Sequence, residues 1–277
     1  TRHVEAMAAL VAAIERVVAL PAWQETVLGW APAMARQTTA AAGVFLGYDF
    51  HLGEGGPRLI EINTNAGGAL LNAILGRAQR ACCPEVAQVM DALPDAANDL
   101  ETRFVDMFRS EWRLVRGDLP LRTIAIVDEA PQSQYLLPEF LLFQRLFERH
   151  GIAARICDPA ELVHSAEGLT LHGQSVDLVY NRLTDFAFEA ASSAALRSAW
   201  LDGSAVITPH PRAHALYADK RNLVLLSDPA ALRRLGVDEA TVAILGAGVP
   251  HTEAVSPARA DDLWARRRQL FFKPASG

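Results

Sequence analysis

Residues 47–68 hold the side chains with the clearest potential for chemistry. Two apolar stretches flank a Gly-Glu-Gly-Gly sequence, which predicts two antiparallel strands joined by a turn. With a three-residue loop, Asp49 lies opposite Glu61, and Asn63 follows on the same face because side chains alternate between the faces of a strand. The hairpin is therefore expected to present two carboxylates and an amide on one face.

The opposite face of this hairpin is expected to be buried. It carries the large apolar side chains Tyr48, Phe50, Leu52, Ile60 and Ile62. The same register pairs His51 with Leu59 and puts His51 on the carboxylate face. A structural or merely exposed histidine is the simpler interpretation there, and a catalytic one is the alternative.

Facing carboxylates need a cation, because like charges directly opposite each other on paired strands are destabilising. Mg²⁺ meets that need, since it prefers oxygen ligands and is commonly held by one or two carboxylates together with substrate phosphates. Asp49, Glu61 and Asn63 are accordingly the predicted metal ligands. A solvated face with scattered charges is the other explanation of the same pattern.

Two lysines occupy positions where an anion is expected nearby. Lys273 closes an apolar run, and a lysine at the end of a buried strand loses hydration unless it meets an anion such as a phosphate. Lys220 follows Asp219 at the predicted start of a helix, an end that favours anions over cations. The plainer alternatives are a Lys273 that reaches into water and a Lys220 that meets a neighbouring acid.

Composition excludes several classes of protein. The chain has 277 residues, a length typical of roughly two domains, and 51% of them are hydrophobic, as in globular proteins. Its 26 Lys and Arg against 32 Asp and Glu give a net charge of −6, so neither nucleic acid nor an anionic membrane is an expected partner. Three cysteines without metal-site spacing favour a reducing compartment, and the cytoplasm is the expected location.

The middle of the chain has the alternating pattern of an α/β layer with a largely parallel sheet. The predicted strands are 123–127, 152–157, 176–180 and 205–208. The predicted helices are 135–150 and 188–201, and a short hairpin is expected at 168–176. The first strand is not followed by the GxGxxG turn of dinucleotide-binding folds, which disfavours a nicotinamide dehydrogenase.

Elements outside this block complete the prediction. A helix at 4–20 lies within an N-terminal segment, residues 1–42, that is expected to cover the apolar face of the hairpin. A long helix is expected at 95–116, and a further helix from Asp219. Residues 270–273 are the predicted last strand.

Together these residues resemble the ATP-grasp superfamily. Glu61-Ile-Asn63 with Asp49 upstream is similar to its Mg²⁺-binding motif. Asp219-Lys220 before a Leu-rich segment, and Phe-Phe-Lys273 before Pro-Ala-Ser-Gly, resemble its two nucleotide-binding lysines and the start of its Gly-rich flap. The lysines follow the Glu-x-Asn motif instead of preceding it. The likeness is therefore to the circularly permuted branch, which includes glutathionylspermidine-synthase-like and glutathione-synthetase-like proteins.

The resemblance implies an α/β fold of three parts. Residues 1–118 would hold the N-terminal helical segment and the Mg²⁺-binding hairpin of the ATP-grasp domain. Residues 119–210 would form a pre-ATP-grasp parallel-sheet domain, and residues 211–277 the first nucleotide-binding portion. The family's flap and further strands would follow Gly277, so more chain is expected there, and a chain ending at Gly277 is expected to bind nucleotide poorly.

The resemblance also implies an activity, the ATP-dependent joining of a small-molecule carboxylate to an amine through an acylphosphate. ATP and Mg²⁺ would be the cofactors, with Lys220, Lys273, Ser276 and Gly277 on the nucleotide. Arg182, just after a predicted strand, is the expected catalytic residue and would hold the substrate carboxylate or acylphosphate; an ion pair with Asp185 is its alternative.

Two other functions share this expected fold: a kinase acting on a hydroxyl, and a non-catalytic nucleotide-binding protein. The sequence does not specify which acid and amine would be joined. It also leaves the oligomeric state open, with a homodimer among the options.

Overall fold

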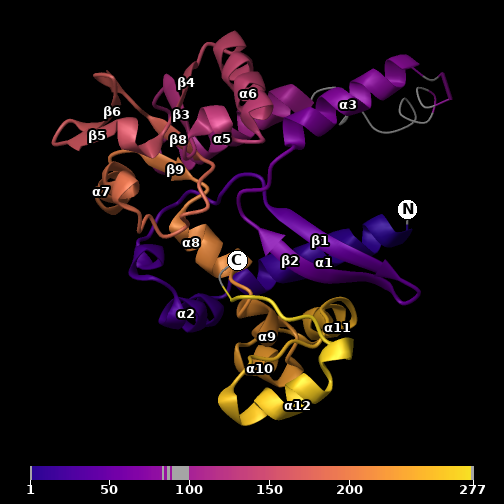
Figure 1. The fold of residues 1–277 in the computed structure, drawn as a ribbon. Coiled ribbons are helices and arrows are strands. Elements are labelled where there is room, and N and C mark those ends of the chain that lie inside the picture. The colour runs from indigo at the N-terminus through magenta and orange to yellow at the C-terminus, as the bar shows by residue number, and fades with distance from the viewer. Residues whose placement is uncertain (1, 83, 86–87, 89–99, 276–277) are drawn as a thin grey trace. The chain divides into compact units, whose positions relative to one another are not determined.

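The computed structural model describes residues 2–82, 84–85, 88 and 100–275 and contains two compact units (Figure 1). Unit 1 consists of Thr1–Pro32, Gly47–Asn63 and His214–Gly277, and unit 2 of Ala33–Leu46 and Thr64–Ala213. Each unit therefore draws on separated stretches of the chain. The sequence-based division into three consecutive segments stays a prediction.

A four-stranded parallel sheet forms the centre of unit 2, in the order β4-β3-β8-β9. Its strands are β3 (Thr123–Val127), β4 (Ala153–Cys157), β8 (Leu178–Asn181) and β9 (Val206–Thr208). The four strands predicted for this region are present, and the mixed α/β class is confirmed.

Helices share a core with each face of this sheet (Figure 1). One set of alternating strand side chains, which includes Ile126, packs with α5 (Leu100–Arg116) and α6 (Leu137–Arg149). The other set, which includes Val127, packs with α7 (Ala194–Asp202). This alternation is what a strand buried on both faces requires.

The strand order changes direction between β3 and β8. From β3 the chain passes through α6 to β4 on one side of β3, and it later returns to form β8 on the other side. In parallel α/β sheets such a reversal opens a crevice at the carboxyl ends of the two strands. Asp128 and Arg182 directly follow β3 and β8, at that edge of the sheet.

Smaller elements complete unit 2. The predicted hairpin at 168–176 is confirmed as β6 (Gly168–Leu171) and β7 (Gln174–Ser175), and β5 (Leu162–Ser165) adds a strand that was not predicted. The helix predicted at 188–201 begins only at Ala194, after a 3₁₀ turn. The remaining elements are η1 (Ala33–Arg36), α3 (Ala69–Cys82), η3 (Pro131–Ser133), η4 (Pro159–Glu161), η5 (Ala191–Ser193) and α8 (Pro211–Ala213).

Unit 1 is built around a hairpin covered by helices. The hairpin strands, β1 (Gly47–Gly53) and β2 (Gly56–Asn63), share a core with α1 (Arg2–Val18) and α11 (Glu239–Gly248). The N-terminal helix thus covers the hairpin, as predicted, whereas residues 33–42 belong to unit 2. The remaining elements are α2 (Pro21–Trp30), the π-helical turn η6 (His214–Ala218), α9 (Asn222–Leu226), α10 (Pro229–Arg234), η7 (Pro257–Arg259), α12 (Ala260–Ala265) and η8 (Arg267–Gln269).

The hairpin register is as predicted at its carboxylate end and different at its tip. Asp49 pairs with Glu61, as expected. The turn takes two residues instead of three, so His51 pairs with Arg58 and not with Leu59. A β-bulge absorbs the extra residue of the second strand.

The bulge exchanges two side chains between the faces of the hairpin. Leu59 is 1% exposed, whereas Ile60, predicted to be in the core, is 39% exposed. Leu52, near the tip, is exposed as well. An inserted residue reverses the inward and outward alternation on its far side, and the sequence pattern does not reveal where that insertion falls.

Three other predictions need correction or completion. Residues 270–273 form no strand, because no neighbouring strand in the described part of the chain accepts their hydrogen bonds. The helix expected from Asp219 begins at Asn222. The long helix expected at 95–116 is α5, and its first five predicted residues lie outside the described ones.

Among the described residues, no single helix is long and apolar enough to cross a membrane. Helices α1 and α2 reach the required length and composition only when taken together, and they meet at a bend of 79°.

Candidate functional site

Both predicted lysines lie at Glu61. Lys273 Nζ donates a hydrogen bond to Glu61 Oε2 at 2.8 Å, across a sequence separation of 212 residues. Lys220 Nζ lies 3.9 Å from the same oxygen. The Lys273 ammonium holds the pKa of the Glu61 carboxyl below its usual range, and the charge of Lys220 and a hydrogen bond from Asn63 lower it further.

Asp49 and Asn63 lie beside this cluster on the same face of the hairpin. Asp49 is the register partner of Glu61. Asn63 Nδ2 donates to Asp49 Oδ2 at 3.1 Å, as diagonal neighbours across antiparallel strands can. Unit 1 therefore brings together two carboxylates, an amide and two ammonium groups, the same five side chains that the sequence singled out.

A partly buried carboxylate fixes two of the segments that carry these groups. Glu15 of α1 accepts hydrogen bonds from the hydroxyls of Tyr48 at 2.7 Å and Tyr217 at 2.6 Å. Tyr48 directly precedes Asp49 on β1, and Tyr217 lies in the π-helical turn three residues before Lys220. One side chain thus ties the hairpin and the Lys220 turn to the same helix.

The Lys220 turn is held on both sides. Asn222 Nδ2 donates to the carbonyl oxygens of Ala215 and Leu216 in the π-helical turn, at 2.9 and 3.1 Å. The Lys220 backbone N–H donates to the Ala275 carbonyl at 3.0 Å, which brings the segment carrying Lys273 alongside. Wide helical turns of this kind are frequent at functional sites.

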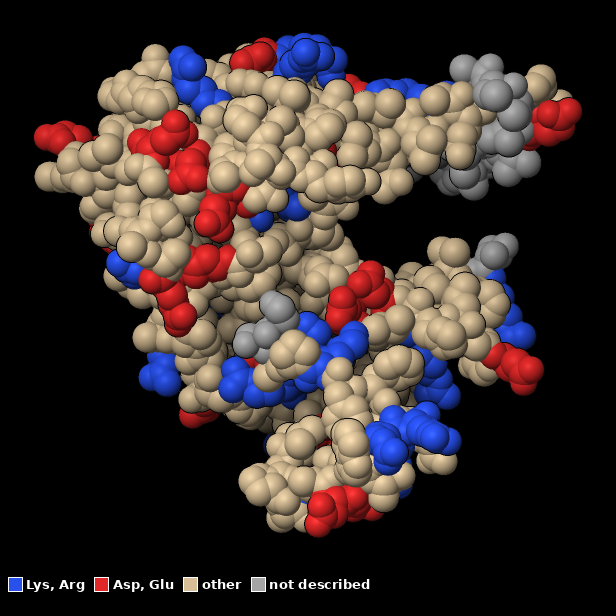
Figure 2. Space-filling view, in the orientation of Figure 1, with Lys and Arg blue, Asp and Glu red and all other residues tan. Residues whose placement is uncertain are grey.

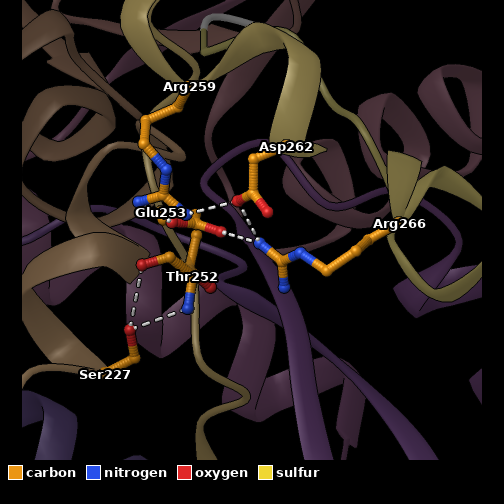
Figure 3. Close-up of polar contacts among 6 residues, drawn as sticks. All are labelled: Ser227, Thr252, Glu253, Arg259, Asp262 and Arg266. Atoms are coloured by element: carbon orange, nitrogen blue, oxygen red, sulfur yellow. Dashed lines mark hydrogen bonds and ion pairs between the residues drawn. The ribbon is translucent and has the colours of Figure 1, made fainter. Parts of the chain in front are cut away.

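An ion-pair network precedes the Lys273 segment (Figure 3). Arg259 and Arg266 both contact Glu253 and Asp262, at distances between 2.8 and 3.2 Å. In the same close-up, the Thr252 backbone N–H donates to Ser227 Oγ at 3.0 Å. These contacts join residues 252–266 to the end of α9, and so help to fix the path that the chain takes toward Lys273.

Basic side chains are also gathered near the C-terminal end of the chain (Figure 2). Figure 2 shows Lys and Arg side chains gathered where Figure 1 labels the C-terminal end of the chain, with acidic side chains beside them. Basic groups on a surface raise the local concentration of anionic ligands.

The donor set of the hairpin suits a hard cation. No group of three or more His, Cys, Asp or Glu that could hold a metal occurs in the part of the chain that the structure describes. Asp49 and Glu61 supply only two carboxylates, with the Asn63 amide oxygen as a third donor. Mg²⁺ accepts such a set when water and phosphate oxygens complete it. The lysines supply the positive charge that Glu61 needs in the free protein.

Three predicted site residues remain, namely Ser276, Gly277 and Arg182. Ser276 and Gly277 fall outside the described residues. Arg182 belongs to unit 2, where it lines a pocket of about 460 Å³ at the carboxyl ends of β3 and β8. Asp185 does not pair with it, since the carboxylate of Asp185 accepts from the backbone N–H groups of Glu189 and Ala190 and from the Ser193 hydroxyl.

Asp128, on the wall of the same pocket, was not predicted to be functional. Burial raises its pKa to about 6, although the Arg182 charge acts in the opposite direction. The only signal in the sequence is an acid directly after a strand, a position that becomes informative once the strand order is known.

Comparison of the sequence with models of known protein families finds no match, and comparison with curated proteins finds none either.

Proposed function

We propose that this chain is an ATP- and Mg²⁺-dependent ligase of the cytoplasm that joins a carboxylate to an amine. The carboxylate would take the γ-phosphoryl group of ATP, giving an acylphosphate and ADP. Attack by the amine would then form the amide and release inorganic phosphate. The observation that carries the proposal is the convergence of Lys220 and Lys273 on Glu61.

The charges of unit 1 support a nucleotide in particular. Ammonium groups 2.8 and 3.9 Å from one carboxylate oxygen are able to turn to phosphate when a metal takes their place. Asp49, Glu61 and Asn63 would hold Mg²⁺, which neutralises phosphate charge when bound. Phosphoryl transfer depends chiefly on positioning and charge compensation, so no nucleophilic Ser, Cys or His is required.

The role proposed for Arg182 follows from the chemistry of its guanidinium group. A guanidinium pairs in bidentate fashion with carboxylate or phosphate, and it stays charged at any physiological pH. We assign it the substrate carboxylate or the acylphosphate. That the acceptor is an amine and not a hydroxyl rests on the family resemblance alone, and identification of the product separates a ligase from a kinase.

A thermal-shift titration with Mg-ATP tests the nucleotide site, on residues 1–277 and on the natural chain at its full length. Ligand at about 100 times its Kd adds about 2.7 kcal/mol to stability, which is several degrees for a protein of this size. We expect Glu61→Gln and Lys273→Ala each to weaken binding by about tenfold or more, since each removes a charge that contacts metal or phosphate.

Arg268→Ala is the matched control, because it removes an exposed cation of the same C-terminal segment, outside the Glu61 cluster. It should leave the Mg-ATP titration within about twofold of the unaltered chain. Absence of a shift in both chain lengths, or an equal shift in the Glu61→Gln and Lys273→Ala proteins, would overturn the proposal.

A further inference from the structure

The pocket of unit 2 has the position and size of a ligand site. It opens where the strand order of the sheet reverses, at the carboxyl ends of β3 and β8. Its volume of about 460 Å³ lies within the usual range for small-molecule sites. All of its lining residues belong to unit 2, so the pocket is complete within that unit.

Arg182 brings a buried positive charge to this pocket. The residue is only 6% exposed, and its Nε is buried without a hydrogen-bond partner. Its other contacts are long: NH1 lies 3.3 Å from the Ala66 carbonyl and 3.5 Å from the Tyr180 hydroxyl, and the guanidinium lies 5.4 Å from the centre of the Tyr180 ring. Within the described residues no carboxylate approaches this guanidinium to 4.0 Å.

Two other acids of this region, Glu139 and Asp185, are already engaged by other groups. Glu139 accepts from the backbone N–H groups of Gly68 at 2.7 Å and Leu70 at 3.0 Å. Asp185 accepts three hydrogen bonds from the segment before α7. A buried cation without a counter-ion is costly. Binding of an anionic group in the pocket would therefore offset the free-energy cost of burying the Arg182 charge.

Asp128 brings an acid to the wall of the same pocket. It receives a hydrogen bond from the Glu129 backbone N–H at 2.9 Å, and within the described residues no cation lies within 4.0 Å of it. The charged groups around it are Arg182, Glu129 and Asp158. Asp158 is engaged, since it accepts from the backbone N–H groups of Ala130 and Ala160.

Opposite charges in one partly buried site normally meet in an ion pair. Here Arg182 and Asp128 directly follow the neighbouring strands β8 and β3 and line the same pocket without an ion pair within 4.0 Å, although each acts on the other electrostatically. A molecule that carries an ammonium and a carboxylate a short distance apart could form an ion pair with Asp128 and with Arg182 at the same time. Asn65, Thr184 and Ser192 on the remaining walls leave room and hydrogen-bonding groups for a side chain.

We propose that this pocket binds a free α-amino acid, with the ligand carboxylate on Arg182 and the ligand ammonium on Asp128. The proposal rests on the proposed function at Arg182, since it names the substrate carboxylate assigned to that residue, and its binding test concerns residues of unit 2 alone.

The first test needs no variant. The proteinogenic L-amino acids are screened at millimolar concentration by thermal shift on residues 1–277, and the best one is then titrated calorimetrically. Its N-acetyl and carboxamide derivatives remove the ammonium and the carboxylate in turn. Each derivative should bind at least about tenfold more weakly than the free amino acid, since each leaves one buried charge without its partner.

Variants assign each charge to its residue. In Asp128→Asn the free amino acid and its N-acetyl derivative should bind alike, and in Arg182→Gln the free amino acid and its carboxamide should bind alike. Gly67→Ala keeps every charge but adds a methyl group 2.5 Å from Leu136 Cδ1 and 3.0 Å from the Arg182 NH2, both in the pocket wall, so it should weaken all ligands together. Glu189→Gln is the control, because Glu189 is an exposed acid of unit 2 that does not line the pocket, and it should leave all of these affinities unchanged.

Two outcomes would overturn the proposal. One is that no L-amino acid shifts the melting temperature of the unaltered chain, and the other is that the derivatives bind as well as the free amino acid. Lys273→Ala should leave amino-acid binding unchanged, so failure of the nucleotide site and failure of this pocket give different results.

Discussion

Glu61 in unit 1 and Glu139 in unit 2 are both satisfied carboxylates, but by different kinds of partner. Glu61 is partly exposed, and its Oε2 meets ammonium groups at the ends of two long side chains. Glu139 is 1% exposed and accepts from two backbone N–H groups at the start of α3. Lysine side chains are able to turn elsewhere when a ligand arrives, whereas backbone N–H groups at a helix start are fixed.

This difference separates acids available to a ligand from acids that hold the fold together. Glu111 belongs with Glu139, since it is buried and accepts from the backbone N–H groups of Ala42 and Gly43 and from the Thr208 hydroxyl. Asp49 belongs with Glu61, on the open face of the hairpin. The type of residue is the same in both groups, so its partners and not its identity indicate its role.

The largest expected effect is on Glu139. Glu139→Ala removes the acceptor of two buried N–H groups, and we expect the free energy of unfolding to fall by about 4 kcal/mol. Urea unfolding at neutral pH measures it. Glu61→Ala, in the same assay, should change the free energy of unfolding by about 1 kcal/mol or less, as is usual for accessible ion pairs. Equal losses in the two proteins would remove the distinction between them.

His210 gives a second large effect, again in unit 2. Its Nδ1 accepts from the Ala213 N–H at 3.0 Å, so Nε2 carries the proton and donates to the Ala41 carbonyl at 3.0 Å. Burial lowers the pKa of His210 to about 4, with a further lowering from the Arg212 charge. In the unfolded chain the imidazole of residue 210 takes up a proton as the pH falls through about 6.5, whereas in the folded chain it stays neutral down to about pH 4. The free energy of unfolding is therefore at its full value above about pH 6.5 and decreases as the pH falls below it.

The expected loss from His210 is about 2 kcal/mol at about pH 5 and approaches about 3 kcal/mol at about pH 4. Urea unfolding across this range measures it, with His210→Gln as a partner that keeps a donor but does not titrate there. The difference in pH dependence between the two proteins should vanish above about pH 7. The same pH dependence in both would show that His210 contributes nothing to acid sensitivity.

The sequence allowed the site of unit 1 to be predicted much better than that of unit 2. Asp49, Glu61, Asn63, Lys220 and Lys273 are charged or polar residues next to apolar runs, a pattern visible without any structure. The pocket of unit 2 depends on which strands are neighbours, because Asp128 and Arg182 meet only where β3 and β8 pair. Strand order is a property of the whole sheet, and local sequence patterns do not reveal which strands are neighbours.

The fold shows a similar limit. Period-2 and helical patterns located the parallel strands and the main helices within a few residues, since those elements are set by burial. The hairpin bulge and the unpaired residues 270–273 escaped prediction because they depend on what lies opposite each segment. His51 and Ile60 were misplaced for that reason alone.

A moderate effect is expected from the tyrosines that anchor unit 1. Tyr217→Phe removes one of the two hydroxyls that donate to Glu15, and we expect a loss of about 2 kcal/mol in the free energy of unfolding because the acceptor is a carboxylate. Tyr48→Phe removes the other and should cost a similar amount. Tyr135→Phe is the matched control, since Tyr135 is 95% exposed, and it should have no measurable effect. A neutral Tyr217→Phe would mean that Glu15 does not anchor this turn.

The smallest expected effect is the coupling between Lys273 and Glu61. A double-mutant cycle of Lys273→Ala and Glu61→Gln should give a coupling of about 0.5 kcal/mol or less in the free energy of unfolding. It should shrink further as salt is added, because accessible charges are screened. The same cycle measured on Mg-ATP affinity should give a larger coupling, since in the complex one residue faces the metal and the other a phosphate. A strong coupling in stability would instead place this pair with Glu139, as a fixed contact of the fold and not as a charge held ready for a ligand.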